Sequence, residues 1–258
     1  PTAIRGDVAA ADVRKVALTY TNFCREVIDV VAPLVGVVKP QAAFFEQLGP
    51  HGMLALADVI RYAREKELLV VLDGKRNDIG STAAAYAQGI LGAGEASPWG
   101  ADALTVSPYL GDDSLTPFVD VALERGAGIF VLVKTSNPGG KMLQDLVVDG
   151  QSIYQRVATH VNGLAEQTAG QSGYGAVGAV VGATYPEQLR ELRAAMPSTW
   201  FLVPGFGAQG GTAADVAPAF DGNGSGAIGN NSRGIILAHA RRPYVDRFGD
   251  SKWQQAVD

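Results

Sequence analysis

Four charged residues fall at or just after the ends of two short apolar runs. Lys39 closes the run VGVVK, and Asp73, Lys75 and Asp78 stand in the segment LLVVLDGKRNDIG. Side chains two apart on a strand point to the same face, so we expect Asp73 and Lys75 to point inward and Gly74 to point out. Any one of these charges could belong to a structural ion pair. Four charged residues of alternating sign favour a functional site with a preset electric field. A structural role alone is less favoured, because burying opposite charges together costs desolvation energy that their pairing only roughly offsets.

A glycine-rich turn near the C-terminal end indicates a second function, the binding of an anion. The segment FLVPGFGAQGG places Gly205, Gly207 and Gly210 in a G-x-G-x-x-G pattern after a predicted strand. A dinucleotide site is a weak interpretation, because this is not the first strand and no ribose-binding acid follows the next one. Exposed backbone N–H groups here, and Arg233 in the next loop, favour a phosphate. The alternative is an ordinary turn and a surface arginine.

Other reactive side chains carry weaker signals. Cys24 lies on a predicted helix and is interpreted as a core residue rather than a nucleophile, and a lone cysteine cannot form an internal disulfide. The polar segments 107–109 and 135–139 follow two further strands, where they could contact a polar ring or simply form turns. The histidines form no metal-binding motif and are interpreted as structural or surface residues; they are His51, His160 and His239. The sequence therefore predicts no metal site.

Seven short apolar runs are predicted to be the strands that position these residues. Several are almost continuously apolar, as strands buried on both faces are. Most are separated by about 25–35 residues, which leaves room for one helix and two loops. The predicted strands are residues 35–39, 68–73, 102–106, 129–133, 177–181, 201–204 and 227–230. The predicted helices are residues 11–31, 53–65, 81–91, 152–167 and 186–195.

This alternation of strand and helix indicates a parallel α/β fold, and eight such units close a (β/α)8 TIM barrel. The sequence opens with a helix, whereas a barrel normally opens with a strand, so we expect the first strand to lie upstream and to be absent from the given sequence. An open, doubly wound sheet of seven strands is the alternative. No linker or break in composition divides the chain, so we predict a single barrel domain over residues 1–258. The last two strands then become the seventh and eighth, whose loops commonly bind phosphate.

Composition excludes several classes of protein. Hydrophobic residues make up 47% of the chain, which is enough for a core and too much for a disordered chain. The net charge of −5, with no long basic run, argues against nucleic acid or an acidic membrane as a partner. No apolar window reaches the ~18 residues of a membrane span, and the N-terminus lacks the apolar core of a signal peptide. We therefore expect a cytoplasmic protein that acts on a small molecule.

Together these segments resemble the orotidine 5′-phosphate decarboxylase family, in particular its longer bacterial subgroup. The segment DGKRNDI at 73–79, with Thr82 shortly after it, is similar to the family's D-x-K-x-x-D-I…T motif. The segment VKPQAAFFE at 38–46 is similar to the strand that supplies the family's first lysine. Residues 107–111, 135–138, 203–211 and 231–235 match as well, so the resemblance covers nearly the whole chain. The G-[IL]-D-P motif of the family's first strand, whose Asp holds the ribose, does not precede Pro1.

The resemblance implies the decarboxylation of orotidine 5′-monophosphate to uridine 5′-monophosphate (UMP) in de novo pyrimidine synthesis, with no cofactor. Lys39, Asp73, Lys75 and Asp78 would form a catalytic tetrad. In it Lys75 protonates C6 of the pyrimidine, Asp73 lies beside the departing carboxylate, and Lys39 orients the network and touches the ribose. A nearby ammonium would both stabilise the carbanion and supply its proton.

The resemblance also implies the residues that bind the nucleotide. Ser136 would contact the pyrimidine, and Gln209 and Arg233 the phosphate. Asp78, with Ile79 and Thr82, would reach into the site of a neighbouring subunit, which implies a homodimer with shared active sites.

Three other functions stay open at this point. A metal-dependent relative of the same barrel group would act on sugar phosphates, although by resemblance it carries an acidic residue in place of Lys39. An aldolase would form a Schiff base through Lys75 or Lys39. A barrel that has lost catalysis would bind phosphate and release no CO2.

Overall fold

The computed structural model describes residues 12–207, 212–240, 242, 244–247 and 253–255, and these contain one seven-stranded parallel sheet. Each strand pairs with the next one in the order β1-β2-β3-β4-β7-β8-β9. The strands are β1 (Val37–Val38), β2 (Leu69–Arg76), β3 (Ala103–Val106), β4 (Gly128–Lys134), β7 (Val177–Val181), β8 (Phe201–Pro204) and β9 (Ala227–Asn230). All seven predicted strands are confirmed, although β1 is shorter than predicted and β2 continues past Asp73.

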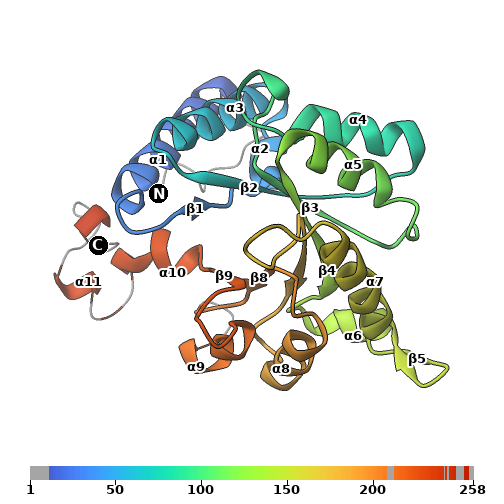
Figure 1. Cartoon of the computed structure of the whole chain (residues 1–258). Coiled ribbons are helices and arrows are strands. Elements are labelled where there is room, and N and C mark those ends of the chain that lie inside the picture. Colours follow the sequence, from blue (N-terminus) through green and yellow to red (C-terminus); the bar gives the residue numbers. More distant parts are fainter. Residues whose placement is uncertain (1–11, 208–211, 241, 243, 248–252, 256–258) are drawn as a thin grey trace.

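Helices connect the strands and lie outside the curled sheet (Figure 1). The longer ones are α1 (Val13–Val31), α3 (Gly49–Glu65), α4 (Gly80–Ile90), α5 (Thr116–Arg125), α7 (Ile153–Gln167) and α8 (Pro186–Ala195). The shorter ones are α2 (Ala42–Glu46), α6 (Lys141–Gln144), α9 (Ala213–Val216), α10 (Arg233–Ile236) and α11 (Tyr244–Arg247). A small antiparallel hairpin, β5 (Val147–Val148) with β6 (Gln151–Ser152), projects from the connection after β4.

Local sequence signals fix where these helices begin and end. The Asp12 carboxylate accepts from the Arg14 N–H at 3.1 Å and caps α1. Residue 11, at which this helix is predicted to begin, lies outside the described residues. Ser152 and Gln155 form a reciprocal capping box at the start of α7. Helix α5 was not predicted from the sequence, although Pro117 in its first turn and Gly126 in a left-handed conformation after its last residue are typical helix signals.

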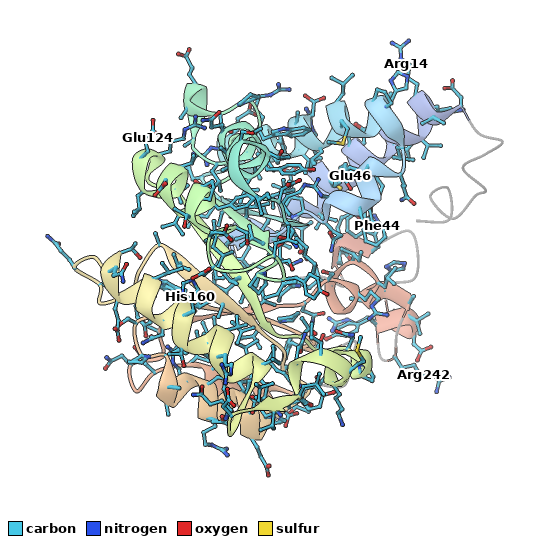
Figure 2. All side chains as sticks on the ribbon, turned by 90° about the vertical axis from the view of Figure 1, so that its right-hand side faces the viewer. Arg14, Phe44, Glu46, Glu124, His160 and Arg242 are labelled. Carbon is cyan, nitrogen blue, oxygen red and sulfur yellow. The ribbon has the colours of Figure 1, made fainter. Side chains whose placement is uncertain are left out.

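The core divides into two layers because successive strand residues point to opposite faces of the sheet. The larger cluster packs the outer face against the helices and includes Val70, Leu72 and Leu104. The smaller cluster lies inside the curl and takes one residue from each of five neighbouring strands: Val71, Ala103, Phe130, Val180 and Leu202. Figure 2 shows the side chains that fill the space between sheet and helices, with Arg14 and Glu124 directed away from them.

A sheet that encloses its own inner cluster, with helices outside it, is a barrel rather than an open doubly wound sheet, which would carry helices on both faces. The (β/α)8 architecture is therefore confirmed, and the described residues supply seven strands of it. Within the described residues, no helix has the length and apolar character needed to cross a bilayer.

Candidate active site

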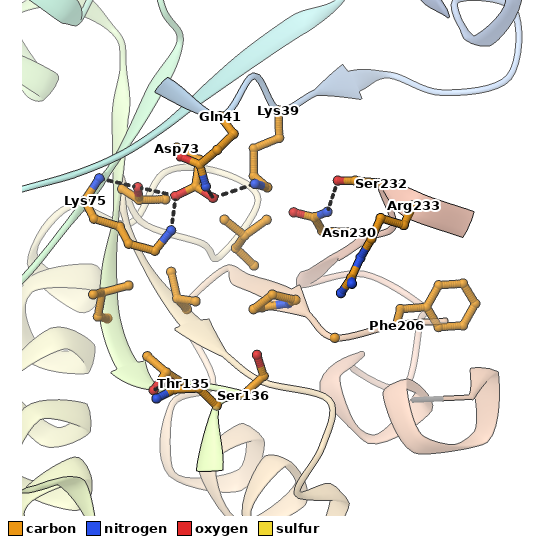
Figure 3. A pocket seen from close by; sticks show the side chains of 17 residues that line it. Lys39, Gln41, Asp73, Lys75, Thr135, Ser136, Phe206, Asn230, Ser232 and Arg233 are labelled. Carbon is orange, nitrogen blue, oxygen red and sulfur yellow. Dashed lines mark hydrogen bonds and ion pairs between the residues drawn. The ribbon is translucent and has the colours of Figure 1, made fainter. Parts of the chain in front are cut away.

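A cavity of about 470 Å³ opens at the carboxyl ends of the strands. Residues from both edges of the sheet line it, since Lys39 follows β1 and Asn230 ends β9. Figure 3 shows the two ends of this cavity, with Lys75 and Asp73 at one end and Arg233 at the other. The full lining is Lys39, Gln41, Asp73, Lys75, Thr105, Leu132, Thr135, Ser136, Asn137, Val180, Leu202, Pro204, Gly205, Phe206, Asn230, Ser232 and Arg233.

The Asp73 carboxylate is the centre of the polar end of the cavity. It is 7% exposed and lies between two ammonium groups: the Lys39 Nζ donates to Oδ2 and the Lys75 Nζ to Oδ1, each at 2.6 Å. The side chains of the two lysines differ in exposure, 15% for Lys39 against 47% for Lys75. Lys75 is therefore the ammonium more open to a ligand in the cavity.

Opposing effects set the charge of Asp73. Burial on its own raises the pKa of the carboxyl, but the positive charge of Lys39 and the hydrogen bonds from Lys39 and Lys75 outweigh it, so the pKa of Asp73 lies below its usual value. Asp73 is therefore ionised at neutral pH. A fixed anion between two cations gives this end of the cavity a strong local field before any ligand arrives.

Lys75 reaches this position through an irregular stretch of backbone. The register between β2 and β3 shifts between Leu72 and Arg76, and Lys75 has a φ of +45°, which is uncommon for a residue with a side chain. Its N–H donates to the Thr105 hydroxyl at 2.9 Å. The prediction that Asp73 and Lys75 share a face is confirmed, although it was based on a regular strand and β2 is irregular between Leu72 and Arg76.

The loop after β4 brings Ser136 to the wall of the cavity. Two contacts hold it: the Thr184 hydroxyl donates to the Ser136 carbonyl at 3.1 Å, and the Thr135 N–H donates to Gln144 at 3.1 Å. Gly182 lies so close that a Cβ there would be 2.8 Å from Ser136, so this approach requires glycine.

The base of the same loop is held by a buried charge. Lys134, the last residue of β4, is 1% exposed; its ammonium pairs with Asp145 and lies over the rings of Tyr154 and Tyr185, at 5.3 and 4.9 Å from their centroids. This ion pair ties the two ends of the segment that carries Ser136.

The opposite wall holds the residues predicted to bind phosphate. Gly205 and Gly207 have φ values of +101° and +74° after β8, and the Arg233 side chain lines the cavity from the start of α10. Figure 3 shows Arg233 directed into this end of the cavity. Two members of the predicted set, Gln209 and Gly210, lie outside the described residues.

Three predicted residues do not line this cavity in their own chain. Asp78 accepts from the N–H of Ile79 at 2.9 Å, and Ile79, at the start of α4, is 55% exposed. Thr82 is exposed on the first turn of the same helix. The structure thus brings together Lys39, Asp73 and Lys75 within one chain and leaves Asp78 outside.

The remaining candidates lie away from the cavity. His51 and His160 are exposed and His239 is buried, as their interpretation as structural or surface residues required. Burial raises the pKa of the Cys24 thiol to about 12, so it is protonated at neutral pH and a poor nucleophile.

Several polar residues that line the cavity were not singled out from the sequence, among them Gln41 and Thr105. Gln41 stands in the segment VKPQAAFFE, two residues after Lys39, and Thr105 is the one polar residue in the buried strand ALTV. A hydroxyl in an otherwise apolar buried strand is a signal that could have found Thr105, because such a group must have a hydrogen-bond partner.

Comparison with known proteins decides the family. The family model described as "Orotidine 5'-phosphate decarboxylase / HUMPS family" matches residues 8–247. The chain belongs to this family. An orotidine 5′-phosphate decarboxylase of Rhodopirellula baltica is 61% identical over all of this chain and 86% of its own length, and one of Deinococcus radiodurans is 50% identical over 83% of this chain and 75% of its own.

Solved structures of the family have the same fold. The orotidine monophosphate decarboxylase of Leishmania donovani superposes with a TM-score of 0.75 at 36% identity, over 93% of this chain and 84% of its own. A putative orotidine 5′-phosphate decarboxylase of Streptomyces avermitilis gives the same TM-score and the same coverage of both chains, at 40% identity. These relatives carry the decarboxylase name, and they give no support to the sugar-phosphate, Schiff-base or non-catalytic alternatives.

Proposed function

We propose that this chain decarboxylates orotidine 5′-monophosphate to UMP, with Asp73 and Lys75 at the reacting carbon. Membership of the decarboxylase family supports the reaction. The observation that carries the assignment of residues is the buried Asp73 carboxylate between two ammonium groups, at the far end of the cavity from Arg233. A nucleotide has its charged phosphate at one end and its base at the other, which matches this separation of charge.

The proposed step breaks the bond between C6 and the carboxylate. CO2 leaves, the electron pair stays on C6, and a proton moves from the Lys75 ammonium to C6. Asp73 lies next to the substrate carboxylate, and the ammonium groups stabilise the charge that develops on C6. Lys39, less exposed than Lys75, orients Asp73 and contacts the ribose. All these groups belong to the chain, so we expect the reaction to need no added metal or organic cofactor.

The other wall binds the parts of the substrate that do not react. Arg233 forms a charge-assisted pair of hydrogen bonds with the phosphate, together with Gln209 and the glycine-rich turn. Ser136 contacts the pyrimidine. Because the phosphate is remote from the bond that breaks, its binding energy helps to assemble the site around the base.

The position of Asp78, Ile79 and Thr82 supports a homodimer with shared sites. None of the three lines the cavity of its own chain, and the exposed side chains of Ile79 and Thr82 are available to a second subunit. We propose that they complete the partner's site.

Two further predictions from the sequence are part of this proposal. One is a single barrel domain over residues 1–258. The other is a cytoplasmic location, which a nucleotide substrate supports.

The experiment that tests this function follows the loss of absorbance of orotidine 5′-monophosphate in the presence of a chelator. We expect UMP and CO2 in equal amounts, and we expect Lys75→Ala to lose this activity while Lys15→Ala, an exposed lysine of α1, retains it. Activity that a chelator abolishes and a divalent ion restores would refute the cofactor-free mechanism. A folded wild-type protein that turns over no substrate would refute the function.

A further inference from the structure

Each oxygen of the Asp73 carboxylate has two hydrogen-bond donors, one charged and one neutral. Oδ2 accepts from the Lys39 ammonium at 2.6 Å and from the Gln41 amide at 3.0 Å. Oδ1 accepts from the Lys75 ammonium at 2.6 Å and from the Thr105 hydroxyl at 2.9 Å. The dashed lines in Figure 3 mark these contacts from Lys39, Gln41 and Lys75. The two neutral donors have no part in the proton transfer itself.

The direction of the Thr105 hydrogen bonds is fixed by the atoms available. A hydroxyl has one hydrogen to donate, and the Thr105 oxygen already accepts from the Lys75 N–H at 2.9 Å. Its hydrogen is therefore the one that points to Asp73. Thr105 is 1% exposed and sits on β3, so one rigid group connects the carboxylate of Asp73 to the backbone of Lys75.

Gln41 holds the other oxygen from the opposite side. Gln41 follows β1, and its backbone forms an isolated parallel β-bridge with Asp73. At this bridge the Asp73 N–H donates to the Pro40 carbonyl at 2.9 Å. The backbone of this turn thus fixes where the Gln41 side chain starts, and the amide reaches Asp73 over a short distance. Gln41 and Thr105 come from strand ends on either side of β2, so together they hold the carboxylate from both neighbours.

We propose that Gln41 and Thr105 are positioning residues for the decarboxylation, which set the orientation of the Asp73 carboxylate and, through Thr105, the backbone of Lys75. This inference rests on the proposed function. The two lysines cannot set that orientation alone, because an ammonium group on a flexible four-carbon side chain can donate to a carboxylate from many directions. Lys75 also has the strained φ of +45°, and the Thr105 hydroxyl bonds to its N–H at that point. Without the neutral donors, the ion pairs of Asp73 form in several geometries, and fewer of these geometries place Asp73 and Lys75 correctly for decarboxylation.

The test separates turnover from binding. Thr105→Val removes the hydroxyl while it keeps the shape of the side chain, Thr105→Ser keeps the hydroxyl, and Gln41→Met removes the amide at similar length. We expect kcat to fall by about 10- to 100-fold in Thr105→Val and in Gln41→Met, the range for losing a hydrogen bond to a charged group. The Kd for UMP should stay within about threefold, because the phosphate end is unchanged. Thr105→Ser should retain most of the wild-type kcat.

The matched control is Thr199→Val. Thr199 is 0% exposed, donates through its hydroxyl to Asn162 at 3.2 Å, and precedes β8 at the opposite end of the sheet from the cavity. It reports what the loss of a buried hydroxyl does to the fold alone, and we expect its kcat to equal that of the wild type.

Three outcomes would overturn the inference while the wild type remains active. One is a kcat of Thr105→Val and of Gln41→Met within about twofold of the wild type. Another is a Thr105→Ser variant as slow as Thr105→Val, and the last is a loss of UMP binding that matches the loss of kcat. A wild type that does not decarboxylate refutes the proposed function instead, so the two failures are distinguishable. If Thr105→Val does not fold, Gln41→Met alone decides, because Gln41 is only half-buried at the edge of the cavity.

Discussion

Removal of Asp145 should destabilise the protein more than removal of the lysine with which it pairs. Asp145→Ala leaves the Lys134 ammonium, 1% exposed, without its counter-ion between two tyrosine rings. Removing one partner of a fully buried pair costs about 3–5 kcal/mol. Because the Asp145 side chain is 30% exposed, water reaches the vacated position, and we reduce the expected cost to about 2–3 kcal/mol.

Lys134→Met should be milder for the same reason. It places an apolar chain of similar length among the tyrosine rings and leaves Asp145 with an exposed face that water can solvate, so we expect a cost of about 1 kcal/mol or less. The double variant should resemble Lys134→Met, since no buried charge is then left unpaired.

Chemical and thermal denaturation of the three variants and the wild type measure these differences. For a chain of this size, each kcal/mol moves the Tm by about 2–4 °C, so Asp145→Ala should melt about 4–12 °C lower. Since Ser136 lies two residues after Lys134, the KM of Asp145→Ala should rise as well. An Asp145→Ala variant as stable as the wild type, or a Lys134→Met variant less stable than Asp145→Ala, would show that this reasoning about the buried charge is wrong.

Four further predictions concern the cavity and the proposed homodimer. Lys75→Ala should lower kcat by orders of magnitude while UMP still binds, and near-normal turnover in steady-state assays would assign the proton to another group. Arg233→Ala should weaken the binding of the nucleotide and leave the reaction of the phosphate-free nucleoside unchanged; equal losses for the two substrates would make Arg233 a structural residue. Mixing inactive Asp78→Ala and Lys75→Ala subunits should restore activity, because one site of each heterodimer then carries neither change; exchange of subunits with no recovery would place Asp78 at its own chain's site. The lowered pKa of Asp73 means that its ionised form stabilises the fold above the ordinary aspartate pKa, and that this contribution is lost as the pH falls through the lowered value. The free energy of unfolding of the wild type should therefore fall relative to Asp73→Asn on acidification below about pH 4, and a relative increase measured by urea denaturation would contradict it.

Residues on regular elements could be placed from the sequence. Asp73 and Lys39 fall at the ends of apolar runs, and the carboxyl ends of parallel strands meet at one edge of the sheet, so their meeting follows from periodicity. The inner cluster follows too, because Val71 and its counterparts alternate with residues that face the helices.

What the sequence could not supply depends on tertiary contacts. The left-handed backbone of Lys75 is coupled to a hydroxyl on β3, and propensity at Lys75 alone gives no sign of it. No sequence pattern indicates the burial of Lys134, because a lysine at the end of a strand normally reaches solvent. Its partners, Asp145 and two tyrosines, come from segments further along the chain. The position of Asp78 outside the cavity follows from where β2 ends and α4 begins, and boundaries of this kind are poorly defined by sequence patterns.

The two edges of the sheet have a thermodynamic consequence. Within the described residues, β1 and β9 are the outer strands, and the cavity takes Lys39 from beyond one and Arg233 from beyond the other. A nucleotide that contacts both bridges segments from opposite ends of the chain, so bound ligand acts as a non-covalent cross-link that the unfolded chain cannot form. At a ligand concentration about 100 times the Kd, such linkage adds about 2.7 kcal/mol to the free energy of unfolding. On the proposed mode of binding, the amount of folded protein is therefore coupled to the supply of its own substrate and product.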